Sequence, residues 1–141
     1  MEQFKEVSQN YTLPEAIREA QRCLGCKVPG CKKGCPIGND IPDWISQLAK
    51  GNFGNAIEII RSRSNLPAVC GRVCAHERQC EGNCALAKSG KHINIGKLER
   101  FVADFDSAAG LDHDMIPEKT KGQVAVIGLS LIHISEPTRP Y

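Results

Sequence analysis

The segment 23–36 reads CLGCKVPGCKKGCP and holds half of the chain's eight cysteines. The other half lie in the segment 70–84, which reads CGRVCAHERQCEGNC. Two thiols separated by two residues, as Cys23 and Cys26 are, can be turned onto one metal centre by a single tight loop. Two groups of four closely spaced thiols therefore predict a metal framework that could complete two four-cysteine sites.

The first quartet resembles the cysteine run of bacterial ferredoxins. In that run three closely spaced cysteines hold one [4Fe-4S] cluster, and a fourth, followed by proline, reaches a second cluster. By this resemblance Cys35, which precedes Pro36, belongs to a different site from Cys23, Cys26 and Cys31.

The composition favours a domain stabilised by bound metal over a nucleic-acid-binding, membrane-associated or disulfide-bonded protein. Aromatic residues make up only 5% of the chain, so metal sites would supply cross-links that a thin core lacks. A net charge of +2 is too mild to indicate a nucleic-acid or membrane partner. Residues 1–6 lack the apolar core of a secretory signal, which predicts the reducing cytoplasm and disfavours disulfides. Structural zinc stays open as an alternative to iron–sulfur clusters.

Apolar residues at helical spacing predict helices after Thr12, between Asp40 and Gly51, from near Asn52, and from Asn94 to Gly110, and no strand before residue 110. Thr12 and Glu15 form a capping box for the first helix, which is expected to carry Cys23 and Cys26 at its end. Trp44 is expected in the core. The positions expected to face inward on the first and last helices are Ala16, Ile17, Ala20 and Leu24, and Ile95, Leu98, Phe101, Val102 and Phe105.

The second quartet has its own helical spacing. Cys70 with Cys74, and Cys80 with Cys84, are each four residues apart, so each pair would share one face of a short helix. The intervening residues 75–79 are expected to turn.

The C-terminal part predicts the beginning of a second domain. Residues 112–122 are expected as a linker, and 123–128 as the first strand of a nucleotide-binding unit, with Gly128 as its first cofactor-binding glycine. Ser130 and His133 stand where the second and third glycines of the dinucleotide fingerprint are needed. Residues 129–141 resemble the translation of sequencing-adapter DNA, which predicts a non-native tail.

Four blocks of sequence together resemble the N-terminal iron–sulfur domain of the glutamate synthase small (β) subunit, a domain shared with dihydropyrimidine dehydrogenase and related flavin oxidoreductases. The blocks are the first quartet with Pro36, the CGRVC of 70–74, the CEGNC of 80–84 and the IGKLERF of 95–101. The resemblance covers residues 10–128. It implies an all-α fold, a small helical bundle over 1–111 organised around two [4Fe-4S] clusters and followed by one vestigial strand.

The same resemblance implies the ligands, residue by residue. One cluster would be held by Cys23, Cys26, Cys31 and Cys84, and the other by Cys35, Cys74, Cys80 and Glu99. Cys70 would then carry no iron. From the residues alone the choice stays open, because Cys70 lies one helical turn from Cys74. His76 and His92 are either zinc ligands or exposed loop residues.

The function implied is that of an electron-transfer domain in an NAD(P)H-dependent flavin and iron–sulfur oxidoreductase, most like the glutamate synthase small subunit. The intact enzyme would use FAD and NAD(P)H, with its own flavin domain and a large subunit or another electron acceptor as partners. This chain alone, without a flavin domain, would not be catalytically competent. A dihydropyrimidine dehydrogenase-like or ferredoxin–NADP oxidoreductase-like enzyme is the alternative within the family, and a zinc-binding interaction module the alternative from another class.

Overall fold

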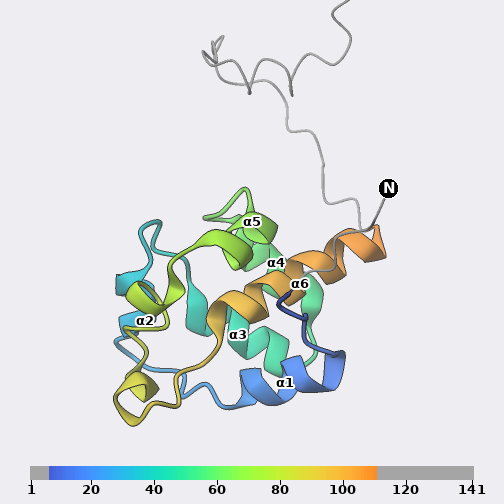
Figure 1. Ribbon diagram of the computed structural model, residues 1–141. Helices are drawn as coiled ribbons and strands as arrows, with labels where there is room; N and C mark the ends of the chain where they lie inside the picture. Colours follow the sequence, from blue (N-terminus) through green and yellow to red (C-terminus); the bar gives the residue numbers. More distant parts are fainter. Residues whose placement is uncertain (1–6, 111–141) are drawn as a thin grey trace, which may run out of the picture. The chain divides into compact units, whose positions relative to one another are not determined.

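The computed structural model describes residues 7–110, so the expected linker 112–122, the strand 123–128 with Gly128, and the tail 129–141 lie outside the described residues. Within 7–110 the chain forms six α-helices and two short 3₁₀ helices, and this part contains no strand (Figure 1). The predicted all-α fold is confirmed for the described residues.

Helix α1 (Leu13–Gln21) begins at the predicted capping box. The Thr12 backbone N–H donates to the Glu15 carboxylate at 2.8 Å, and the Thr12 hydroxyl donates to the same oxygen at 2.6 Å. The helix ends earlier than predicted, at Gln21, and Gly25 turns the chain at a φ of 57°. Cys23 and Cys26 therefore lie in the loop after α1. Leu24, predicted to face inward, is 64% exposed.

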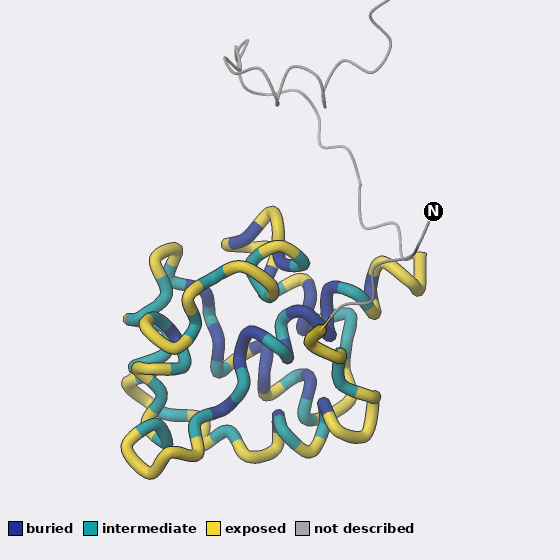
Figure 2. The backbone as a smooth tube through the Cα atoms, viewed as in Figure 1, coloured by how far each residue is buried: buried dark blue, intermediate teal, exposed yellow. Residues whose placement is uncertain are grey.

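The core lies where α3 (Ile41–Ala49) packs against α1 and α4 (Phe53–Arg61), and where α4 packs against α6 (Ile95–Ala109). Figure 2 shows the buried parts of the tube in the interior of the described chain. Trp44 is fully buried, as predicted. The side chains that fill this core most completely are Trp44, Ile45, Leu48, Ile57, Ile60, Leu98 and Val102.

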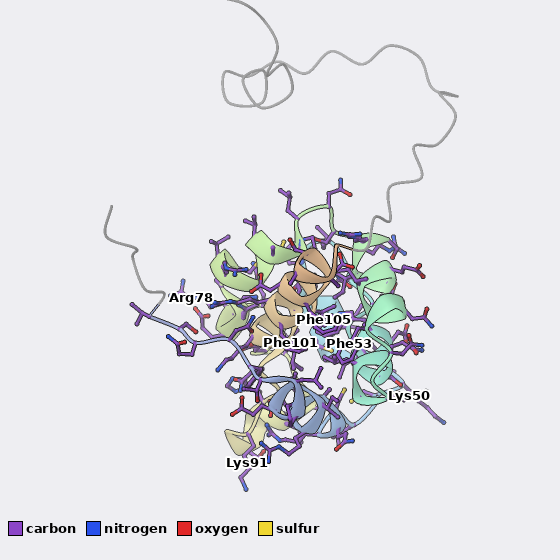
Figure 3. The ribbon with its side chains drawn as sticks, turned by 90° about the vertical axis from the view of Figure 1, so that its right-hand side faces the viewer. Lys50, Phe53, Arg78, Lys91, Phe101 and Phe105 are labelled. Atoms are coloured by element: carbon purple, nitrogen blue, oxygen red, sulfur yellow. The ribbon has the colours of Figure 1, made fainter. Side chains whose placement is uncertain are left out.

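Phe105 departs from the prediction, because 37% of its surface is exposed. Its ring lies 4.7 Å from the ring of Phe53 between centroids, and the Phe53 ring lies 6.3 Å from that of Phe101 (Figure 3). Phe101 is 7% exposed and belongs to the core, whereas the rings of Phe53 and Phe105 cover the end of the core on the α4 and α6 side.

Helix α6 packs closely against α5 (Pro67–Val73), the helix that carries Cys70. A Cβ atom added to Gly71 would lie 2.6 Å from the backbone nitrogen of Arg100 and 2.8 Å from its Cα. Only glycine permits this backbone approach. The contact sets the distance between the second quartet and the α6 residue Glu99.

The loop that follows α5 packs against α2 (Gly30–Gly34), the short helix that carries Cys31. A Cβ atom on Gly30 would lie 2.2 Å from the carbonyl oxygen of Asn83, and one on Gly34 would lie 2.6 Å from that of Gln79. These two approaches bring the first cysteine segment against the second, and Figure 1 shows the two segments side by side near the α2 label.

The second quartet is only partly helical. Cys70 lies within α5 and Cys74 ends it, but Cys80 and Cys84 lie in a continuous turn between η1 (His76–Arg78) and η2 (Ala85–Ser89). The prediction of a second short helix with Cys80 and Cys84 on one face is therefore wrong. The reason is local, since Asn83 Nδ2 donates to the Gln79 carbonyl at 2.7 Å and stabilises the turn.

Candidate metal centre

One cavity is walled by the thiols of Cys23, Cys26, Cys31 and Cys84. Cys23 and Cys26 come from the loop after α1, Cys31 from α2, and Cys84 from the residue before η2. Leu24, Pro42, Leu86 and Ile93 complete the lining with apolar groups. The space between the walls is narrow, about 20 Å³. We call it the first cavity.

The four thiols of the first cavity are close enough to influence one another electrostatically. Burial raises the pKa of the Cys31 thiol to about 11, and Cys23, Cys84 and Cys26 raise it further through like-charge repulsion. Burial also raises the pKa of Cys23, with Cys26 and Cys84 contributing. Ionising these buried thiols costs free energy unless a cation compensates the negative charge. A bound metal supplies such a cation.

A second cavity, of about 150 Å³, is walled by side chains that the fold gathers from four segments. Cys35 lies at the end of α2, Cys74 at the end of α5, Cys80 in the turn that follows, and Glu99 on α6. The other lining residues include Cys70, His76, Asn39, Pro36, Ile37, Ile41 and Gln79.

Three acids of the second cavity, Cys74, Cys80 and Glu99, have pKa values raised above their usual ones. Burial raises the pKa of Cys80 to about 12, with the charges of Glu81, Glu99 and Cys35 adding to the effect. Burial likewise raises the pKa of Cys74 to about 11, followed in size by the effects of Cys70. Burial alone raises the pKa of the Glu99 carboxyl to about 7. The cavity thus holds several potential anions, and the described residues that line it include no lysine or arginine.

Glu99 illustrates this lack of compensation. Its side chain is partly accessible because it lines the cavity, yet no residue among 7–110 forms an ion pair or a hydrogen bond with its carboxylate. Two arginines close in sequence to the site engage other groups: Arg72 pairs with Asp104 at 2.8 Å, and Arg100 donates to the Ser8 carbonyl at 3.0 Å. The carboxylate of Glu99 therefore lacks a compensating charge among the described residues.

Cys70 lines the same cavity, so the structure brings both candidates for the fourth ligand to it. The Cys70 Sγ lies 3.6 Å from the hydroxyl oxygen of the buried Ser64, a contact that a non-ligating thiol can keep. The assignment of Glu99, rather than Cys70, to the second site stays a prediction.

Two buried polar atoms at the second cavity were missed by sequence reasoning. Asn39 is 3% exposed, and its Oδ1 has no hydrogen-bond partner within the described part of the chain. The same holds for the Nε2 atom of His76. His76 is therefore neither an exposed loop residue nor part of a recognisable zinc site. In the sequence, its position between Cys74 and Cys80 was the one indication that it lies near the second site. The groups that surround its ring are visible only in the fold.

His92, the other histidine considered as a ligand, lies away from both cavities. Its Nε2 is 3.4 Å from the Glu81 carboxylate, and its side chain is 39% exposed. Across residues 7–110, no three histidine, cysteine, aspartate or glutamate side chains converge closely enough to hold a single metal ion. None of the helices in this range is long and apolar enough to cross a membrane.

The division of the cysteines between the cavities differs from their division in the sequence. Each cavity takes three cysteines from one segment and at least one from the other, because Cys35 lines the second cavity and Cys84 the first. Such interleaving is the arrangement of two-cluster ferredoxins. Residues 1–111 match the model of the family described as dihydropyrimidine dehydrogenase domain II, 4Fe-4S cluster. The chain belongs to this iron–sulfur family.

Relatives with curated names include subunits of glutamate synthase and of dihydropyrimidine dehydrogenase. It is 39% identical over 127 residues to the glutamate synthase [NADPH] small chain of Halomonas elongata, a match that covers 89% of this chain and 27% of the relative. It is 40% identical over 123 residues to the NAD-dependent dihydropyrimidine dehydrogenase subunit PreT of Escherichia coli, covering 87% of this chain and 30% of the relative. The resemblance to these two enzymes is confirmed. The chain spans less than a third of the length of either relative.

A [4Fe-4S] cluster is the cofactor of this family, and the residues present fit it. The cysteine-lined walls offer the thiolate ligands that such clusters use, and the uncompensated buried acids are the counterpart of a cationic iron centre.

Proposed function

We propose that this chain binds two [4Fe-4S] clusters, one in each cavity, and relays electrons between them within an oxidoreductase. The observation that carries the proposal is the sorting of the eight cysteines into two separate cavities, with one cysteine exchanged between the sequence quartets. A cluster bound in such a site accepts and donates one electron at a time.

We assign Cys23, Cys26, Cys31 and Cys84 as the ligands in the first cavity. In the second we assign Cys35, Cys74, Cys80 and Glu99. The assignment of Glu99 is supported by its place on the cavity wall and by the absence of a compensating cation among the described residues. An oxygen ligand in place of a thiolate would give the second site a different reduction potential from the first, which suits two centres with different tasks.

The surrounding residues contribute by excluding water and holding the ligands in place. Pro42, Leu86 and Ile93 line the first cavity, and Ile37 and Ile41 line the second. Apolar walls of this kind lower the local polarity, which tunes reduction potentials. The glycine contacts of α2 with the 79–83 turn fix the distance between the two cavities.

For the intact protein we propose an NAD(P)H-dependent flavoprotein that resembles the glutamate synthase small chain. The relatives at 35–40% identity support an oxidoreductase of this type. Hydride from NAD(P)H would reduce FAD in a domain of the same protein, and the residues of this chain would pass single electrons to a large subunit or another acceptor. A dihydropyrimidine dehydrogenase-like enzyme is supported almost equally, by the 40% identity to PreT. We propose the cytoplasm as its compartment, because the seven ligand thiols must stay reduced to bind iron.

The test is the metal content of the full chain after anaerobic reconstitution with iron and sulfide. We expect about eight irons and about eight acid-labile sulfides per chain, as two four-iron clusters require. The same reconstitution is repeated with zinc and iron both present. Stoichiometric zinc with negligible sulfide in that protein would show a zinc-binding module instead. About four irons per chain would limit the proposal to one cavity.

A further inference from the structure

The backbone of His76 is fixed by three hydrogen bonds to its carbonyl oxygen. His76 begins η1, directly between the second-cavity residues Cys74 and Cys80. Its carbonyl oxygen accepts the backbone N–H groups of Gln79 at 3.1 Å, Glu81 at 2.9 Å and Gly82 at 3.3 Å. Three donors on one carbonyl leave this residue little freedom to move.

The imidazole ring is held by Gly96, the second residue of α6. A Cβ atom added to Gly96 would lie 2.3 Å from Cε1, 2.4 Å from Nε2 and 2.5 Å from Nδ1 of His76. Nearly equal distances to three ring atoms mean that Gly96 lies over the face of the ring. The in-plane direction in which an N–H group would donate is therefore not blocked by Gly96.

The start of α6 is tied to the same turn, which strengthens the clamp on the ring. The Gly96 N–H donates to the Glu81 carboxylate at 3.0 Å, and the other oxygen of Glu81 lies 3.4 Å from His92 Nε2. Both oxygens of Glu81 therefore have partners other than His76. The ring is fixed on its backbone side and on one face.

The Nε2 atom of this immobilised ring has nothing to bond within the described residues. It is buried without a hydrogen-bond partner, and the residue lines the second cavity. A buried N–H group left unpaired costs about 1–3 kcal/mol, so such groups almost always have an acceptor. The acceptors that the proposed function supplies in this cavity are the sulfur atoms of a cluster and of its cysteine ligands.

We propose that His76 donates a hydrogen bond from Nε2 to a sulfur atom of the cluster site in the second cavity. The bond stabilises the more negative, reduced state and so raises the reduction potential of that site. This role rests on the proposed function, because the acceptor exists only when the second cavity holds a cluster. His76 is a positioning and tuning residue and not a ligand.

The test compares His76→Phe and His76→Gln in the full, anaerobically reconstituted chain. Phenylalanine keeps a flat ring against Gly96 but removes the donor, whereas glutamine keeps a donor. His92→Phe is the matched control, because it removes a histidine of the same loop region that lines neither cavity. The readout is the reduction potential of each cluster, which is measured by redox titration with electron paramagnetic resonance detection.

We expect His76→Phe to move one of the two potentials to a more negative value and to leave the other in place. His76→Gln should return the shifted potential toward that of the wild type, and His92→Phe should change neither. Two loaded clusters with unchanged potentials in His76→Phe would overturn the donor role. Failure of the wild type to load a cluster in the second cavity would instead refute the proposed function itself.

A second measurement covers the case in which the His76 variants do not fold. It uses a protein with His92, His113 and His133 replaced by Phe, so that His76 is the one ¹⁵N-labelled histidine. Pulsed electron paramagnetic resonance of the reduced protein should show a weak coupling between one histidine nitrogen and one cluster. No coupling would overturn the proposal. A strong coupling, as from a nitrogen bound directly to iron, would also overturn it by making His76 a ligand.

Discussion

Cys35 and Cys84 each line the cavity that belongs mainly to the other cysteine segment. Each cavity is therefore closed only when segments 23–36 and 70–84 are in contact. Metal binding and tertiary folding are coupled by this exchange, because neither cavity can form from one segment alone.

Removal of iron is expected to abolish most of the cooperative structure. Clusters that join two distant segments supply cross-links that the few aromatic residues of the core do not replace. Circular dichroism during heating, with and without a strong iron chelator under anaerobic conditions, checks this. A sharp thermal transition in the iron-free protein would show that the helices and their apolar faces suffice.

Substitutions at the second cavity should separate Cys70 from Glu99. Cys74→Ala is expected to abolish one cluster and leave about four irons per chain, and Glu99→Ala to disturb that same cluster. Cys70→Ala should retain both clusters and cost only packing, about 1 kcal/mol. Iron analysis and visible absorption check all three. Loss of a cluster in Cys70→Ala with none in Glu99→Ala would reverse the assignment.

Gly71→Ala should lower the free energy of unfolding of the loaded protein by about 1–3 kcal/mol. The reason is that its Cβ would lie 2.6 Å from the Arg100 backbone nitrogen, which forces α5 and α6 apart. Gly54→Ala is the matched control, since nothing lies within 4 Å of its Cβ position. That change should leave stability unchanged or raise it by up to about 1 kcal/mol. Thermal unfolding midpoints check the order; equal midpoints would show that α5 and α6 tolerate the separation.

The chain with the sequence given is expected to bind no FAD. Dinucleotide binding requires glycines where the backbone approaches the pyrophosphate, and Ser130 and His133 occupy two of those places after Gly128. NADPH should therefore leave the visible spectrum of the loaded chain unchanged, while dithionite should bleach it. Stoichiometric FAD after incubation and gel filtration would contradict this expectation.

The sequence by itself determined the helical class, the main helices and the presence of an iron–sulfur framework. These properties depend on local patterns. Apolar spacing predicts the core side of α3, and the Thr12 and Glu15 pair predicts where α1 begins, because caps and amphipathic faces involve residues close together in the chain. The early end of α1 and the turn at Cys80 to Cys84 were not predicted, because the left-handed backbone of Gly25 and the bond from Asn83 Nδ2 to the Gln79 carbonyl override the helical spacing there.

Only the tertiary structure decided what surrounds each chemical group. Cys70, His76 and Asn39 carry no local sign that they share a cavity with Glu99, since the contacts that bring them together join α5, α6 and the loop after α2. Whether Glu99 is uncompensated also depends on where Arg72 and Arg100 lie in space, and they engage Asp104 and Ser8 instead. Spacing along the chain can predict that thiols will bind metal, but burial and missing partners are properties of packing between distant segments.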